Sequence, residues 1–199
     1  MKFITFSDFH EDFDQLDTLI SRAKEDDIDF TIVAGDMTVF SKGLRPVLKR
    51  LDSIGKKVYV IPGNHEEGAG FDKIVKDYSN CVNFDRQSIE LENDFVLLGY
   101  GRDGFSQKDP EFRKVARSWY GKFKNKKVIL VTHGPPANCK LDVVSGHHVG
   151  NIDYRGFIER IKPKVAICGH IHETAGEVDT IGETNVVNPC WEGMVIELV

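Results

Sequence analysis

Five apolar segments of the chain have the length and composition of buried β-strands, and each ends in a short polar cluster. Segments with helical periodicity lie between several of them, and this alternation predicts a mostly parallel sheet that is covered on both faces. Because sites in such α/β folds form beyond the carboxyl ends of the strands, polar residues that follow different strands can meet in space. The clusters are Asp8-Phe9-His10, Gly35-Asp36, Gly63-Asn64-His65-Glu66, His133 and Gly169-His170-Ile171-His172.

The same patterns predict the order of the elements along the chain. In the first part they indicate strands at residues 2–6, 29–34 and 57–61, and helices at 13–24 and 44–54. A less regular middle part is expected to hold a helix at 71–78 and short, partly antiparallel strands at 82–84, 88–91 and 95–100. Further along we expect helices at 110–120 and 153–161, strands at 127–132, 164–168 and 194–198, and a hairpin over 177–187.

The segment 137–152 has no clear periodicity, and it includes His147 and His148. Long irregular loops in compact proteins are often lids or binding loops, and surface disorder is the alternative. We predict that this segment forms a wall of the substrate pocket. A contact between either histidine and the bound substrate is a further hypothesis.

The composition limits the class of protein. A length of 199 residues, with 41% hydrophobic and 29% charged residues, suits one domain that spans residues 1–199. The net charge of -5 argues against an extended nucleic-acid-binding surface. The four cysteines have no C-x-x-C spacing, which indicates reduced thiols, and no segment approaches the about 20 apolar residues of a membrane span. These features predict a cytoplasmic protein without a membrane partner.

His170 and His172 follow an apolar run at positions that point to the same side of extended backbone. Neutral imidazole is the commonest metal ligand, although most such pairs in soluble proteins are exposed or make structural hydrogen bonds. The value of this pair as a metal signal therefore depends on whether the other strand ends supply partners.

Each of the other clusters has an ordinary structural explanation. Asp8 and Asp36 could cap helices, Asn64 and His65 could belong to a turn, and His133 could be a hydrogen-bonded core residue. Together these explanations would require five strand ends to carry metal-ligating residue types by coincidence. The sequence therefore favours one metal site built from several strand ends.

The complete set of motifs, D-x-H, G-D, G-N-H-E, H and G-H-x-H in that order, resembles the calcineurin-like metallophosphoesterase superfamily. The resemblance spans residues 8–172. The stretches Thr132-His133-Gly134-Pro135-Pro136 and Gly169-His170-Ile171-His172-Glu173 are most similar to small metallophosphoesterase-domain proteins linked to cyclic nucleotide phosphodiesterase activity. The resemblance implies a four-layer α/β sandwich with mixed, largely parallel central sheets flanked by helices, in a single compact domain without a cap domain.

The resemblance also implies a set of ligands for two divalent or transition metal ions. One ion would be held by Asp8, His10, Asp36 and His172, and the other by Asp36, Asn64, His133 and His170, with Asp36 bridging them. This mixture of imidazole, carboxylate and amide groups without thiolate suits manganese, with iron or zinc as alternatives.

The same resemblance implies a mechanism and a substrate class. A metal-bridging hydroxide would attack phosphorus in a small phosphate ester, and His65 would contact the phosphate and assist the leaving oxygen. Asp36 and His65 are therefore the expected catalytic residues. The oligomeric state is not predicted.

One motif departs from the protein phosphatase branch of the superfamily. That branch has G-D-x-x-D-R-G, whereas this chain has Gly35-Asp36-Met37-Thr38-Val39-Phe40, without the second Asp or the Arg. Protein phosphatase activity is therefore disfavoured, and the group that orients His65 is not identified. Three hypotheses follow: a phosphodiesterase for small diesters, a phosphomonoesterase of the same fold, and a catalytically weak protein-interaction module. Because every ligand position and His65 are present, the sequence favours an enzyme.

Overall fold

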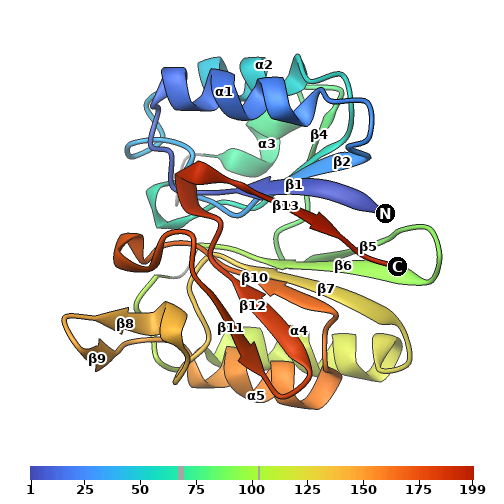
Figure 1. Cartoon of the computed structure of the whole chain (residues 1–199), viewed down its shortest axis with the longest axis vertical. Helices are drawn as coiled ribbons and strands as arrows, with labels where there is room; N and C mark the ends of the chain where they lie inside the picture. The colour runs from blue at the N-terminus through green and yellow to red at the C-terminus, as the bar shows by residue number, and fades with distance from the viewer. Residues whose placement is uncertain (67–69, 103) are drawn as a thin grey trace.

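Two β-sheets pack face to face, and helices cover the outer face of each sheet (Figure 1). The computed structural model describes residues 1–66, 70–102 and 104–199. Several central strands are buried along their whole length, which explains why they read as continuous apolar runs in the sequence. The result is a mixed α/β fold in four layers, with the sheets in the middle.

The first sheet has five strands in the order β13-β1-β2-β3-β4. All neighbours pair in parallel except β13, which is antiparallel to β1 at the edge. The helices α1, α2 and α3 cover its outer face and bury their apolar stripes there. The bounds are β1 (Lys2–Phe6), β2 (Phe30–Val33), β3 (Val58–Val60), β4 (Cys81–Asn83), β13 (Met194–Glu197), α1 (Phe13–Ala23), α2 (Leu44–Asp52) and α3 (Phe71–Val75).

The second sheet has six strands in the order β11-β12-β10-β7-β6-β5. Its central strands are parallel, and the two edge strands are antiparallel to their neighbours. The helices α4 and α5 lie on its outer face. The bounds are β5 (Gln87–Glu90), β6 (Phe95–Tyr100), β7 (Lys127–Thr132), β10 (Val165–Ile167), β11 (Val178–Ile181), β12 (Thr184–Val187), α4 (Pro110–Phe123) and α5 (Ile152–Ile161).

The inner faces of the two sheets share one apolar core. Phe3 and Phe30 stack within it, with ring centroids 5.0 Å apart, and Leu97 and Ile129 of the second sheet belong to the same core. Each sheet is thus covered on both faces, as predicted, although the sequence pattern does not say whether a helix or another sheet provides the cover. Each sheet has helices on one face and the other sheet on the second face. Both arrangements bury a strand completely, so the apolar pattern alone does not distinguish them.

Two local predictions also need correction. Asp8 and Asp36 do not cap helices, because the N-cap residues of α1 and α2 are Asp12 and Gly43. The helix expected at 71–78 ends already at Val75. The side chains of Asp8 and Asp36 therefore have a role other than helix capping.

The segment 137–152 is ordered rather than irregular throughout. It contains a 3₁₀ helix, η2 (Lys140–Asp142), and a hairpin of β8 (Val143–Val144) and β9 (His147–His148). The buried Asp142 carboxylate accepts hydrogen bonds from the backbone amides of Asn138, Cys139 and Gly150, at 2.9–3.1 Å. The hydroxyl of Thr174 donates to the carbonyl of Leu141, so this segment is attached to the turn that follows His172.

The carboxyl ends of strands from both sheets meet on one side of the molecule, at the left in Figure 1. The Asp8 carboxylate, after β1, accepts a hydrogen bond from the backbone amide of His170, after β10, at 3.0 Å. The His133 ring, after β7, contacts the carbonyl of Ala34, after β2, at 2.9 Å. Face-to-face packing therefore joins the strand ends of both sheets in one site.

Within the described residues, no helix is both long and apolar enough to cross a membrane.

Candidate metal centre

The predicted site residues lie together at the meeting point of the two sheets. Their ligand atoms form three groups in which all atoms lie within 4.8 Å of one another. The Asn64 side-chain oxygen joins them at 3.0 Å from Nε2 of His133. The groups are Asp8, His10 and His172; His10, Asp36 and His65; and Asp36, His133 and His170.

Asp36 is at the centre of the cluster. Its Oδ1 accepts a hydrogen bond from the backbone amide of His65 at 3.0 Å, which aims Oδ2 at the imidazoles. Oδ2 lies 3.4 Å from Nε2 of His133, 3.9 Å from Nε2 of His10 and 4.0 Å from Nε2 of His65. Burial raises the pKa of Asp36, but the charge and hydrogen bond of His133 outweigh burial and hold this pKa well below its usual value. Asp36 is therefore a carboxylate within reach of several ligand groups.

His133 shows that the centre attracts positive charge. Burial lowers the pKa of this imidazole, yet the carboxylates of Asp36 and Asp8 outweigh it and raise the pKa. Because the Ala34 carbonyl can only accept, Nδ1 carries a proton and Nε2 is the atom that faces Asp36 and Asn64. A metal cation at this position would meet the same two oxygen atoms. The charge of the site thus suits a cation.

His170 supplies a second indication of fit to a metal. Its Nε2 is buried and has no hydrogen-bond partner among the described residues. Burial, followed by the charge of His133, lowers its pKa to about 4, so the ring is neutral at neutral pH. Nε2 of His10 lies 3.3 Å from Nε2 of His172, so these two ring nitrogens also converge at the centre. Neutral imidazole nitrogens without conventional partners are what a divalent cation requires. The donor set therefore fits metal ions.

The backbone of the cluster is strained. Asp8, His10, Asp36 and His170 have φ of 54°, 42°, 48° and 71°, in the left-handed region that residues other than glycine rarely adopt. Each such residue costs about 1–3 kcal/mol, and such strain is concentrated at functional sites. The surrounding fold therefore imposes a geometry on these side chains that local propensity would not choose.

Two motif glycines allow the carboxylates to approach the backbone. A Cβ atom on Gly63 would lie 2.0 Å from Oδ1 of Asp36, and one on Gly169 would lie 2.3 Å from Oδ2 of Asp8. Both distances are far below van der Waals contact. Any larger residue at these positions would displace the aspartates, which explains the glycine in G-N-H and in G-H-x-H.

Glu66 has a role that the sequence did not reveal. Its buried carboxylate accepts hydrogen bonds from the Thr38 amide at 2.9 Å, from the Thr38 hydroxyl at 2.6 Å and from the Gly63 amide at 2.8 Å. It therefore joins the loop after β2, which carries Asp36, to the loop after β3, which carries Asn64. The G-N-H-E motif contains this residue and its partner Gly63, but Thr38 is 28 residues away in the sequence.

Replacing Glu66 with Ala is expected to lower the free energy of unfolding by about 2–4 kcal/mol, because three buried donors lose their acceptor. Urea unfolding of the metal-free protein measures this loss. The control is Glu90→Ala, at an exposed position of β5, which should change stability by less than about 0.5 kcal/mol. Equal stability of the Glu66 and Glu90 variants would contradict a structural role for Glu66.

Phe40 takes the place of the missing aspartate beside His65. The Phe40 amide donates to Nδ1 of His65 at 3.4 Å, and the two rings stack with centroids 4.5 Å apart and an interplanar angle of 22°. The Ser41 hydroxyl donates to the His65 carbonyl at 3.0 Å. Nδ1 is therefore an acceptor, and Nε2 is the nitrogen that faces Asp36.

His147 and His148 lie on β9, and neither belongs to the groups of candidate ligands found among the described residues. Nδ1 of His148 lies 2.6 Å from Oδ1 of Asp142, so this histidine secures the hairpin. The hypothesis that either one contacts phosphate gains no support from this placement. The prediction that segment 137–152 forms a wall of the substrate pocket remains a prediction.

The fold and the clustered ligands define an α/β protein with a candidate metal centre rich in histidine. The model of the calcineurin-like phosphoesterase family matches residues 1–174. The chain therefore belongs to this family of metal-dependent phosphoester hydrolases. It is also 32% identical over 201 residues to MJ1162, an uncharacterized protein of Methanocaldococcus jannaschii, over 95% of this chain and 88% of that protein.

Solved structures share the fold at low sequence identity. TT1561 of Thermus thermophilus is similar with a TM-score of 0.78 and 12% identity, over 95% of this chain and 88% of that chain. A dimetal phosphatase from Danio rerio has a TM-score of 0.61 and 10% identity, over 94% of this chain and 86% of that chain. At these identities the likeness establishes the architecture and not the substrate.

Proposed function

We propose that the protein is a dinuclear metal-dependent phosphodiesterase that hydrolyses small phosphodiesters. The observation that carries this proposal is that two of the three ligand groups at the centre have no shared member. One group is Asp8, His10 and His172, and the other is Asp36, His133 and His170. Asp36 also approaches His10 of the first group, at 3.9 Å, which supports its role as a bridge between two ions.

The ions would supply Lewis acidity and the hydroxide that attacks phosphorus. The chain contributes the remaining parts of the reaction. Asp36 and Asp8 fix the position of positive charge, and Asn64 adds a neutral oxygen ligand beside His133. His65, held by Phe40 through Nδ1, presents Nε2–H to the phosphate and donates a hydrogen bond to the leaving oxygen, which stabilises its developing negative charge. We place manganese in the site, with iron or zinc as alternatives.

We propose a diester rather than a monoester as the substrate because of the net charge of the metal centre. Two divalent cations carry more positive charge than Asp8 and Asp36 neutralise, which suffices for a singly charged diester. The motif position that carries Arg in protein phosphatases is Phe40 here, so the additional cation for a doubly charged monoester is not supplied there. The alternatives are a phosphomonoesterase, as in the dimetal phosphatase of similar fold, and a catalytically weak interaction module.

The test compares bis(p-nitrophenyl) phosphate with p-nitrophenyl phosphate after removal of metals with EDTA and addition of Mn²⁺. We expect kcat/KM for the diester to exceed that for the monoester by about tenfold or more, a difference of roughly 1.4 kcal/mol in transition-state stabilisation. Equal or faster monoester hydrolysis would favour the monoesterase. A protein that binds manganese but hydrolyses neither ester would favour the interaction module.

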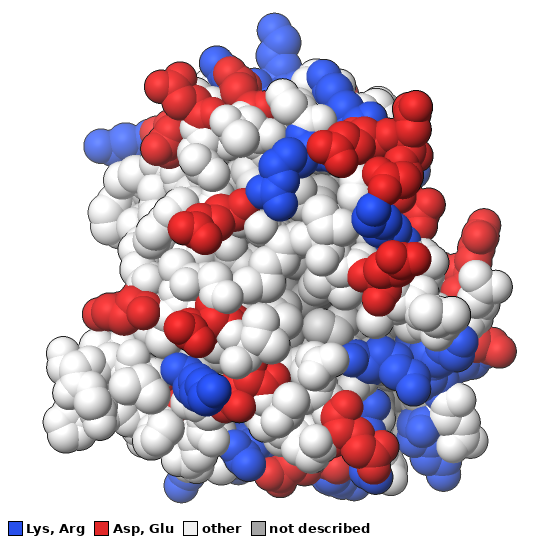
Figure 2. Space-filling view, viewed as in Figure 1, with Lys and Arg blue, Asp and Glu red and all other residues white. Residues whose placement is uncertain are grey.

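The cellular location and partners remain predictions. All four cysteines are free and buried, in agreement with the reduced thiols expected for the cytoplasm. On the face shown in Figure 2, acidic and basic side chains are interspersed, and uncharged residues occupy the middle. We propose a cytoplasmic enzyme whose partner is a small phosphate ester rather than a nucleic-acid surface.

A further inference from the structure

Two phenylalanine rings at the candidate metal centre are exposed to solvent. Phe40 is 71% exposed and Phe105 is 62% exposed, which is unusual for side chains of this size and polarity. Each ring contacts a histidine of the centre. Phe40 stacks on His65, and Phe105 meets the His170 ring edge-to-face with centroids 4.3 Å apart and an interplanar angle of 68°. The two rings thus contact histidines that belong to different groups of candidate ligands at the centre.

The backbone holds Phe40 in its exposed position. Phe40 and Ser41 have φ of 51° and 64°, a strained conformation for a bulky residue. Neighbouring hydrogen bonds maintain it, since the Ser41 amide donates to the Thr38 hydroxyl at 3.1 Å and the Val39 amide donates to Glu11 at 3.1 Å. Strain that the surrounding structure maintains at a site indicates a function for the side chain it positions.

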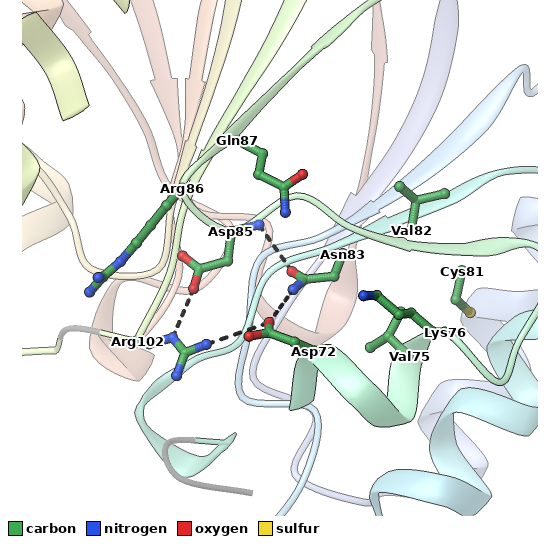
Figure 3. Close-up of a pocket in the computed structure, with 10 residues that line it drawn as sticks. All are labelled: Asp72, Val75, Lys76, Cys81, Val82, Asn83, Asp85, Arg86, Gln87 and Arg102. Atoms are coloured by element: carbon green, nitrogen blue, oxygen red, sulfur yellow. Dashed lines mark hydrogen bonds and ion pairs between the residues drawn. The ribbon is translucent and has the colours of Figure 1, made fainter. Parts of the chain in front are cut away.

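The segment that carries Phe105 is attached on both sides. Before it, the Arg102 amide donates to the Pro62 carbonyl at 2.7 Å, and Nε of Arg102 pairs with Asp85 at 2.8 Å. Figure 3 shows that Arg102 also points toward Asp72, at the wall of a polar cavity of about 810 Å³. After it, the side chain of Asn151 donates to the Ser106 carbonyl at 2.7 Å. Phe105 therefore projects from anchored backbone.

Neither exposed ring is needed to complete the apolar cores, whose members are buried. A solvent-exposed aromatic ring is stabilised by contact with another flat aromatic group, in stacked or edge-to-face geometry. Each phenylalanine has one side against a site histidine and much of its surface open to solvent. An aromatic group attached to a phosphate at the centre would lie beside these exposed ring surfaces.

We propose that Phe40 and Phe105 form an aromatic subsite, which binds the flat aromatic part of an ester group on the phosphate, either an aryl group bonded directly to the phosphate oxygen or a nucleobase carried by a sugar ester. This inference rests on the proposed function, because it assumes that the phosphate binds at the metal centre. It specifies the substrate class as phosphodiesters with at least one ester group that contains an aromatic ring.

Binding to the manganese-loaded protein tests the subsite without turnover. Calorimetry would compare phenylphosphonate with methylphosphonate, and adenosine monophosphate with ribose phosphate. We expect the wild-type protein to bind the aromatic member of at least one pair about 5-fold to 30-fold more tightly, the range for a single stacking contact. Only the nucleotide pair should show this preference if the natural group is a nucleobase.

The variants Phe105→Leu and Phe40→Leu keep an apolar side chain and remove the aromatic face. Each should lose most of the preference for the aromatic ligand, and Phe105→Leu should leave affinity for methylphosphonate within about twofold. Phe40→Leu is judged by the preference alone, because the Phe40 ring also stacks on His65. The matched control is Val195→Ala, at another exposed apolar residue, on β13, and it should keep the wild-type ratio. A wild-type protein without aromatic preference, or leucine variants that retain it, would overturn the subsite.

Kinetics separate this inference from the proposed function. The esters p-nitrophenyl phenyl phosphate and p-nitrophenyl ethyl phosphate share one leaving group and differ in the other ester. A lower KM for the phenyl ester that depends on Phe105 supports the subsite. Because the p-nitrophenyl group of either ester could also occupy the subsite, both esters are compared in the wild-type protein and in Phe105→Leu. Equal KM values that Phe105→Leu leaves unchanged overturn the subsite and leave the phosphodiesterase intact. An aromatic binding preference in a protein that hydrolyses neither ester supports the subsite and refutes the proposed activity.

Discussion

Replacing Asp36 with Asn is expected to abolish turnover, with a fall in kcat of more than about 10³-fold, and to weaken metal binding. The amide has the same size as the carboxylate and retains an oxygen for the His65 amide. It removes the negative charge and turns one ligand atom into a donor that faces His133 and His10. Activity with a diester and metal content by mass spectrometry measure the two effects.

Asp94→Asn is the matched control, since Asp94 is exposed and pairs with Lys126 away from the centre. It should retain both activity and metal. Full activity of the Asp36 variant would refute the dinuclear centre. Loss of only one ion with residual activity would show that Asp36 serves a single ion rather than a bridge.

Replacing His65 with Ala is expected to lower kcat by about 10²-fold to 10³-fold with metal content unchanged, the range for loss of one hydrogen-bond donor to a developing negative charge. The distinction matters because the ligand atoms of His65 also group with those of His10 and Asp36. If His65 is a ligand, the variant will lose metal in proportion to activity. If it donates a hydrogen bond to the leaving oxygen, activity should recover preferentially with a leaving group of low pKa, whose negative charge needs less stabilisation.

His147→Ala is the control for the loss of an imidazole, because His147 is exposed on β9 outside the candidate ligand groups. It should leave kcat and metal content at the wild-type values. A fall in kcat would restore the hypothesis that the hairpin contributes to the phosphate site.

The candidate site was accessible from the sequence because each ligand directly follows a strand. Strand ends are marked by a local change from apolar to polar residues, and parallel strands bring their carboxyl ends to one edge. Asp8, Asp36 and His133 were therefore predicted together before their contacts were known. The expected division of ligands between two ions stays a prediction, and two of the three groups in the structure each contain only residues expected for one ion.

The sequence by itself determined the order of the elements and the residue types at the strand ends, because periodicity and motif spacing are local properties. The tertiary structure decided that the sheets pack against each other, that Glu66 joins two loops and that Phe40 orients His65. It also decided that Phe105 lies against His170. These contacts join residues far apart in the chain, and apolar pattern leaves their partners undetermined because many packings bury the same surface.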